Sequence, residues 1–207
     1  MQAERVSKLT SKETTNSNAV EINGIRFELL IPKRVWTIPA KNSQVENPVE
    51  IGIRIINKTQ APVRFTRIDP LSVITLQIAR TGTDGSLLNL TIVARELLFN
   101  RSREERQSNY NCQLVLPGES LTFFPEAKLF WEDEQLTLGE PDQGGSRWYI
   151  RLPEVGTYKV GFRYNNPSPG VGVVGCFDPN AVSPTYLETG LWTGKVLTPF
   201  VEVQIVE

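Results

Sequence analysis

The most regular alternation of apolar and polar residues in this chain begins just after a turn rich in proline and glycine, residues 152–156. Downstream of that turn, every second residue is large and apolar or aromatic, and the residues between are polar or glycine. The apolar set is Tyr158, Val160, Phe162 and Tyr164. A period of two is typical of a β-strand with one buried face. The pattern therefore predicts a strand whose apolar face lies in a core.

Similar patterns recur along most of the chain and are separated by short turns. They predict strands at 20–31, 35–38, 49–56, 63–65, 71–80, 87–93, 113–116, 121–124, 148–152 and 198–206. Pro32 interrupts the first of these, as in an edge strand. Asp84-Gly85 predicts a hairpin turn, and residues 57–62 and 117–120 carry further turn residues. An antiparallel all-β fold follows from this series.

The predicted strands form one domain preceded by a tail. Residues 1–19 are mostly polar and show no periodicity, so we expect a disordered polar tail before a single domain at 20–207. The polar stretch 99–111 could be a linker between two domains. Each flank would then hold only about four or five strands, too few to bury both faces of a sheet. We therefore interpret 99–111 as a long loop.

Composition and charge narrow the function further. The chain has 207 residues, with 22 Lys and Arg against 23 Asp and Glu, so its net charge of −1 gives no field that attracts nucleic acid or an anionic membrane. No apolar stretch is long enough for membrane insertion, and the N-terminal residues lack the apolar core of a secretory signal. These features predict a cytoplasmic protein. Cys112 and Cys176 could pair, although free thiols are the expected state in that compartment.

Catalytic chemistry has few candidates in this sequence. Histidine is absent, which excludes Ser-His-Asp and Cys-His arrangements and histidine-containing zinc sites. The acidic cluster Glu132-Asp133-Glu134 could hold Ca²⁺ or supply a carboxylate pair, but it lacks the spacing of an EF-hand loop. We interpret it as a solvated acidic loop. The expectation is a protein that is not an enzyme and needs no metal and no cofactor.

Tryptophans and one long connection are the remaining candidates for binding. Trp131 and Trp192 lie near predicted loops and could form an aromatic platform for a sugar ring or a peptide, or they could be core residues. Trp148 alternates with Ile150 and Leu152, which favours the core. The connection at 165–190 is longer than structureless loops usually are, and it carries an apolar, glycine-rich run. Such a run either folds back on the domain or meets a partner.

Three turns give the chain a resemblance to a known family. The residues are Asn57-x-Thr59-x-x-Pro62-Val63-x-Phe65, Leu116-Pro117-Gly118-Glu119-Ser120-Leu121-x-Phe123 and Leu152-Pro153-x-x-Gly156-Thr157-Tyr158. They resemble the corresponding turns of bacterial immunoglobulin-like domains, and Gly156-x-Tyr158 is similar to the tyrosine corner of such sandwiches. Val160 stands where antibody domains have cysteine. The resemblance implies an immunoglobulin-like β-sandwich with long loop insertions, and its branch of intracellular proteinase inhibitors implies binding to a protease.

Together these observations predict a non-enzymatic protein-binding module, of which a proteinase inhibitor would be one form. The alternative is a carbohydrate-binding module that uses loop tryptophans. The expected partner is another protein, and its contact residues are predicted to be Val173, Val174, Cys176, Phe177, Tyr186, Trp192 and Trp131.

Overall fold

The computed structural model describes residues 18–41, 45–66, 74–82, 84–90, 93–95, 112–140, 147–166, 176–177, 186–187 and 190–207. Every regular element within these ranges is a β-strand, so the predicted all-β class is confirmed. None of the described segments forms a helix that could span a membrane.

The largest sheet is organised around one long strand, β15 (Gly156–Asn166). Its order is β3 (Val35–Thr37), β19 (Val201–Val206), β15, β7 (Ile74–Thr81) and β8 (Leu87–Leu90), and β18 (Gly194–Leu197) also pairs with β15. The pairs in this sheet are antiparallel except β3 with β19, which is parallel. Strand β15 therefore has hydrogen-bonded neighbours along both edges.

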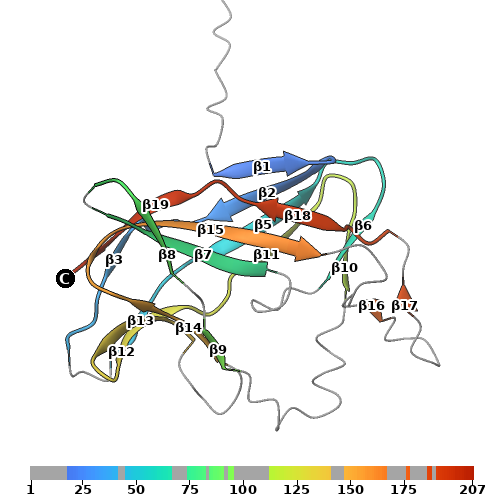
Figure 1. Cartoon of the computed structure of the whole chain (residues 1–207). Coiled ribbons are helices and arrows are strands. Elements are labelled where there is room, and N and C mark those ends of the chain that lie inside the picture. Colours follow the sequence, from blue (N-terminus) through green and yellow to red (C-terminus); the bar gives the residue numbers. More distant parts are fainter. Residues whose placement is uncertain are drawn as a thin grey trace, which may run out of the picture.

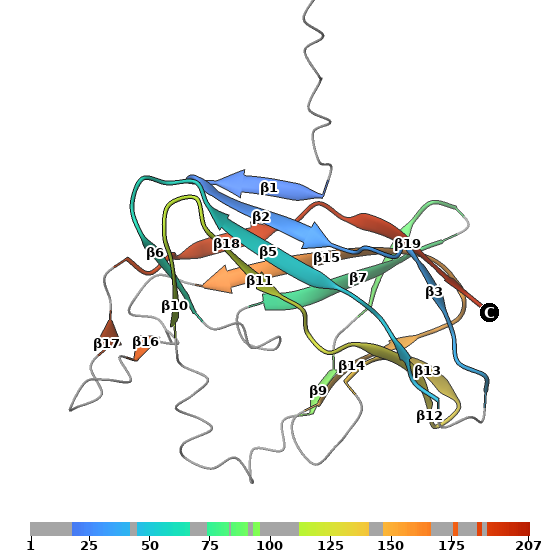
Figure 2. The same ribbon diagram turned by 180° about the vertical axis from the view of Figure 1, so that it is seen from behind.

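Two further sheets cover this one. A four-stranded sheet has the order β1 (Ala19–Ile22), β2 (Ile25–Leu30), β5 (Gly52–Asn57) and β11 (Ser120–Phe123). A five-stranded sheet has the order β4 (Asn47–Pro48), β12 (Lys128–Glu132), β13 (Gln135–Gly139), β14 (Arg147–Leu152) and β9 (Val93–Arg95). In both Figure 1 and Figure 2, β12, β13, β14 and β9 lie together below β15, β7 and the four-stranded sheet.

Two short ribbons complete the described strands. β6 (Val63–Thr66) pairs with β10 (Cys112–Val115), and β16 (Cys176–Phe177) pairs with β17 (Tyr186–Leu187), both antiparallel. The first ribbon continues β5 and β11 past a bend at residues 57–62 and 116–119.

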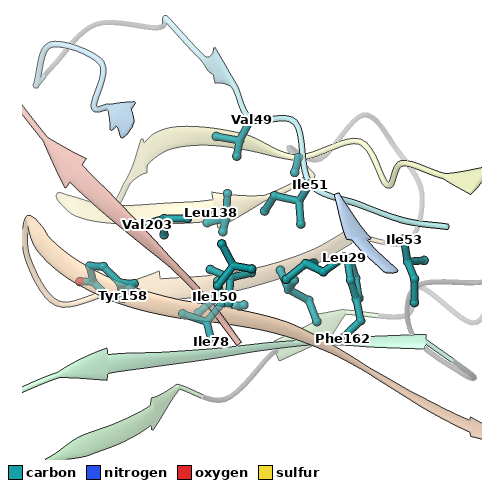
Figure 3. Close-up of a cluster of buried hydrophobic side chains, with 14 of the residues drawn as sticks. Leu29, Val49, Ile51, Ile53, Ile78, Leu138, Ile150, Tyr158, Phe162 and Val203 are labelled. Atoms are coloured by element: carbon teal, nitrogen blue, oxygen red, sulfur yellow. The ribbon is translucent and has the colours of Figure 1, made fainter. Parts of the chain in front are cut away.

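One hydrophobic core joins the three sheets. Tyr158, Val160, Phe162 and Tyr164 are all buried, so the face predicted from the alternation in β15 is confirmed. Figure 3 shows how side chains from different sheets meet: Leu138 and Ile150 gather with Ile78 of the large sheet and Leu29 of the four-stranded sheet. Trp148 is also buried, as its alternation indicated.

The first predicted strand is in fact a hairpin. Asn23 and Gly24 have φ of 52° and 73°, and β1 pairs with β2 across them. Two-residue hairpin turns of the common type I′ need positive φ at both positions, which Asn-Gly supplies at little cost. The prediction of one strand over 20–31 is therefore wrong, because apolar residues continue on both sides of the turn.

The predicted acidic loop is also a hairpin. Asp133 and Glu134 form its turn with φ of 48° and 62°, and β12 pairs with β13 on either side. Both turn residues are exposed, as expected of a solvated segment, but Trp131 belongs to a strand and not to a loop. Among the described residues, no group of three or more potential ligands is placed to hold a metal ion.

The last predicted strand, 198–206, is divided differently. β18 precedes it, and β19 begins at Val201, after Pro199. Between them, the Thr198 hydroxyl accepts a hydrogen bond of 2.9 Å from the Phe162 amide, and the Thr198 amide donates to the Phe162 carbonyl. Thr198 thus provides hydrogen-bond partners for the backbone amide and carbonyl of Phe162, at the point where β15 passes from pairing with β19 to pairing with β18.

The two long insertions are described only in part. Residues 99–111 lie outside the described residues, as do the polar residues 1–17, whereas Ala19 already belongs to β1. Within 165–190, β15 extends to Asn166, and the backbones of β16 and β17 pair with each other. The side chains of Cys112 and Cys176 are outside the described part, so the expectation that they are free thiols stays a prediction.

A buried asparagine holds the bend between β5 and β6. The Asn57 amide nitrogen donates to the carbonyls of Ala61 (2.8 Å) and Val115 (2.9 Å), and its side-chain oxygen accepts from the amide and the hydroxyl of Thr59. Its backbone also bonds to Glu119 and Gly118. Asn57 therefore ties the turn at 58–62 to the chain between β10 and β11.

Replacing this asparagine should be costly. We expect Asn57→Ala to lower the free energy of unfolding by about 2–4 kcal/mol, because buried partners lose their hydrogen bonds. Urea denaturation measures the change. Asn89→Ala, at an exposed position of β8, is the matched control and should stay within about 0.5 kcal/mol of the parent protein. Equal effects of the two substitutions would contradict the role given to Asn57.

Tyr158 closes the turn before β15. Its hydroxyl donates to the Glu154 carbonyl, four residues upstream. Burial is the main cause that raises the pKa of the Tyr158 phenol above its ordinary value of 10.0. Because the folded state holds this proton more tightly than the unfolded state, the resulting stability is complete below pH 10 and is lost as pH rises through the raised pKa.

A conservative substitution tests both statements. Tyr158→Phe should cost about 0.5–1.5 kcal/mol at pH 7, the usual net contribution of one hydrogen bond. Above pH 10 the parent protein should lose stability faster than the variant, so the difference between them should shrink. Urea denaturation at pH 7 and at several pH values above 10 measures both effects. A constant difference across this range would show that Tyr158 does not contribute to the alkaline loss.

Candidate binding groove

A groove with a volume of about 370 Å³ opens between the β8 edge of the large sheet and the β12–β14 sheet. Strand β8 forms one wall, and β12, β13 and β14 form the other. Its lining residues are Ile38, Leu88, Leu90, Trp131, Glu134, Gln135, Leu136, Arg151, Leu152, Pro153, Glu154 and Val155. Most of these side chains are apolar, so the groove offers mainly apolar surface.

The β8 wall is an uncovered continuation of the core. Leu88 is in register with Arg80, and Arg80 is in register with Tyr158, so these three side chains point to the same face of the large sheet. Tyr158 is fully buried there, yet Leu88 is 59% exposed. The core therefore ends before it reaches Leu88, although Leu90 on the same strand packs partly against it, and Leu88 faces the groove.

The opposite wall is a row of side chains across three strands. Trp131 is in register with Leu136, and Leu136 with Leu152. Leu136 and Leu152 are buried, whereas Trp131 is half-buried. The Trp131 indole nitrogen donates to the Pro39 carbonyl at 2.9 Å, and the Lys41 ammonium lies 5.5 Å from the ring centroid. These contacts fix the indole with part of its surface toward the groove.

Charged groups lie at the rim. The Arg80 guanidinium forms an ion pair with the Glu154 carboxylate. The Arg151 guanidinium lies 5.8 Å from the Tyr149 ring centroid, two residues back along β14 and away from the turn before β15. Asp133 and Glu134 are exposed at the turn between β12 and β13, and no ion pair joins either to another described residue. The turn beside the groove thus carries two carboxylates that form no ion pair with a described residue.

The structure separates the two tryptophans that were predicted to act together. Trp131 lines the groove, but Trp192 is only 8% exposed. The Trp192 indole packs against Phe27 and Tyr164, with ring centroids 5.1 and 5.2 Å away. A side chain at Gly194 would meet this indole at 2.8 Å. This position favours the core interpretation of Trp192, because a buried indole does not present its face to a sugar or a peptide, and its ligand-binding role stays a prediction.

The other predicted binding residues cannot be compared with this groove. Val173 and Val174 lie outside the described residues, as do the side chains of Cys176, Phe177 and Tyr186. Sequence reasoning missed Leu88 and Leu90. The sequence contains a weak indication of their exposure. The segment Leu87-Leu88-Asn89-Leu90 has no charged residue and places apolar residues on both faces of a strand.

Comparison of the chain with protein-family models, with curated proteins and with solved structures finds no match. The resemblance in the three turns therefore stays an expectation, and the groove has to be interpreted from its own residues.

The contrast between the tryptophans can be measured. Trp192→Ala should destabilise the fold by about 3–5 kcal/mol, the usual cost of emptying a buried aromatic site. Trp131→Ala should cost clearly less, because part of that indole is already in water and its removal leaves a wider groove instead of a closed cavity. Urea denaturation of both variants measures the two losses in the free energy of unfolding. A smaller effect at Trp192 than at Trp131 would contradict the core position of Trp192.

Proposed function

We propose that this chain is a non-enzymatic protein-binding module and that its groove receives apolar side chains of the partner. The observation that carries the proposal is Leu88, which shares a sheet face with buried Tyr158 but is itself 59% exposed. On the opposite face of the same short strand, Leu87 is 47% exposed. Adjacent exposed leucines beside an apolar groove are typical of an interaction surface.

The two edge strands of the large sheet, β3 and β8, differ in a way that supports β8 as the binding site. The segment around β3 is bounded by Pro32 and Pro39 and carries Lys33 and Arg34. Prolines and charges are the usual protection of an edge strand against pairing. The corresponding segment around β8, residues 84–93, has no proline and a single charge, Asp84 in the turn, and two leucines of β8 are exposed. We infer that β8 is the edge that meets a partner.

We also propose that the large sheet and the four-stranded sheet form an immunoglobulin-like sandwich. Two features support it. The chain leaves β2, passes Pro32 and enters β3 in the other sheet, so the first segment contributes to both layers. The Tyr158 hydroxyl bonds back to Glu154, as in a tyrosine corner. The β12–β14 strands are then an insertion before β15, and they form the second wall of the groove.

A selection experiment tests the binding proposal. Random peptides displayed on phage are selected against the full chain, and the recovered peptides are synthesised and titrated. Leu88→Lys should weaken their binding at least tenfold, because a charge replaces the apolar wall. Leu116→Lys is the matched control, since Leu116 is 43% exposed but is not part of the groove, and it should change affinity less than twofold. Recovery of no peptide that depends on Leu88 would overturn the proposal.

A further inference from the structure

We propose that the partner binds as an extended segment that adds a strand to the free edge of β8 and places alternate apolar side chains in the groove. This inference rests on the proposed function and specifies how the partner is recognised. An occupant of this kind uses two features of the site at once, the outer backbone edge of β8, to which no described strand pairs, and the exposed face of Leu88.

The hydrogen bonds of the β7–β8 hairpin show which backbone groups are free. The Gly82 amide donates to the Ser86 carbonyl at 2.8 Å, so these residues form a hydrogen-bonded pair. Hydrogen-bonded and non-hydrogen-bonded pairs alternate in an antiparallel ladder. Leu88 and Leu90 therefore direct their amides and carbonyls toward β7, whereas Leu87 and Asn89 direct theirs away from it. The free edge of β8 thus offers two amides and two carbonyls to an incoming strand.

The same alternation fixes where the partner's side chains go. If an incoming antiparallel strand bonds to Leu87 and Asn89, the residue opposite Leu88 has its side chain on the face of Leu88, with Cβ atoms about 4.5–5.5 Å apart. That face opens into the groove. The next side chain on the same face lies two residues along the partner. The segment must therefore carry apolar residues at positions i and i+2 and no proline at the positions that bond to β8.

Charged residues at one end of the groove would also determine which way round the partner segment binds. Glu134 lines one end of the groove, and Asp133 lies beside it in the same turn. Arg80 already pairs with Glu154, and the guanidinium of Arg151, which also lines the groove, lies 5.8 Å from the Tyr149 ring centroid. A lysine or arginine of the partner near Glu134 would meet carboxylates that have no cation from the described residues. The fitting partner is thus an extended amphipathic segment with a basic residue at one end.

Proline substitution in β8 separates strand addition from simple filling of the groove. Asn89→Pro removes an amide that points outward, so the β7–β8 ladder keeps its hydrogen bonds. Asn89→Ala retains the amide and is the matched control. The probe is the tightest synthetic peptide from the selection against the full chain. We expect Asn89→Pro to weaken binding at least tenfold and Asn89→Ala less than twofold, measured by fluorescence anisotropy.

The peptide supplies an independent test should Asn89→Pro prevent folding. N-methylation at the peptide residues that face Leu87 and Asn89 should abolish binding, and N-methylation at the residues between them should not. Glu134→Lys should weaken binding and reduce its dependence on salt. If Asn89→Pro and every N-methylated peptide bind normally while Leu88→Lys does not, strand addition is wrong and the groove proposal stands. If Leu88→Lys also binds normally, both proposals fail.

Discussion

Strand β15 is the constraint on which the rest of the structure depends. It pairs with β7 along one edge and with β18 and β19 along the other, and its alternate side chains from Tyr158 to Tyr164 are buried without exception. A strand paired on both edges and buried on one face has little freedom to shift, since a slip of one residue would expose the whole apolar set. The neighbouring strands therefore take their register from β15. The turn before it is fixed by Tyr158, whose hydroxyl bonds back to Glu154.

The groove follows from this arrangement. In the row through Val160, Ile78 is buried, and Leu90 on β8 is half-buried. In the row through Tyr158, Leu88 on β8 is more than half exposed. Burial thus declines with distance from β15 toward the β8 edge, because the covering strands β12, β13 and β14 do not extend over the end of β8. The edge strand β8 is exposed because the large sheet extends further than the β12–β14 sheet that packs against it.

The sequence predicted those features that depend on local pattern. Alternation identified the buried face of β15, and Asp84-Gly85 identified the β7–β8 hairpin. The sequence-based prediction failed at Asn23-Gly24, because apolar residues continue on both sides of this turn. It also failed where the turn residues were unusual. Asp133 and Glu134 adopt positive φ without glycine or asparagine, so the sequence does not predict the hairpin of β12 and β13.

The candidate site depended on information that no local pattern contains. Leu88 and Trp192 are both large apolar residues in segments of ordinary composition, yet one is exposed and the other is in the core. The difference lies in what packs against them from distant parts of the chain. Phe27 and Tyr164 enclose Trp192, whereas the face of Leu88 extends past the covering sheet. Only the three-dimensional arrangement distinguishes these two residues.

The energetics explain why both recognition elements are needed. Burial of a leucine-sized side chain contributes about 1.5–3 kcal/mol, so two partner side chains in the groove would contribute about 3–6 kcal/mol. Association itself costs an estimated ~4–15 kcal/mol in lost freedom of motion. Apolar contact alone therefore falls short of the cost over most of that range, and each backbone hydrogen bond to Leu87 or Asn89 adds about 0.5–1.5 kcal/mol. A partner that fills the groove without pairing to β8, or pairs without filling it, would be held weakly, and selectivity comes from the requirement for both.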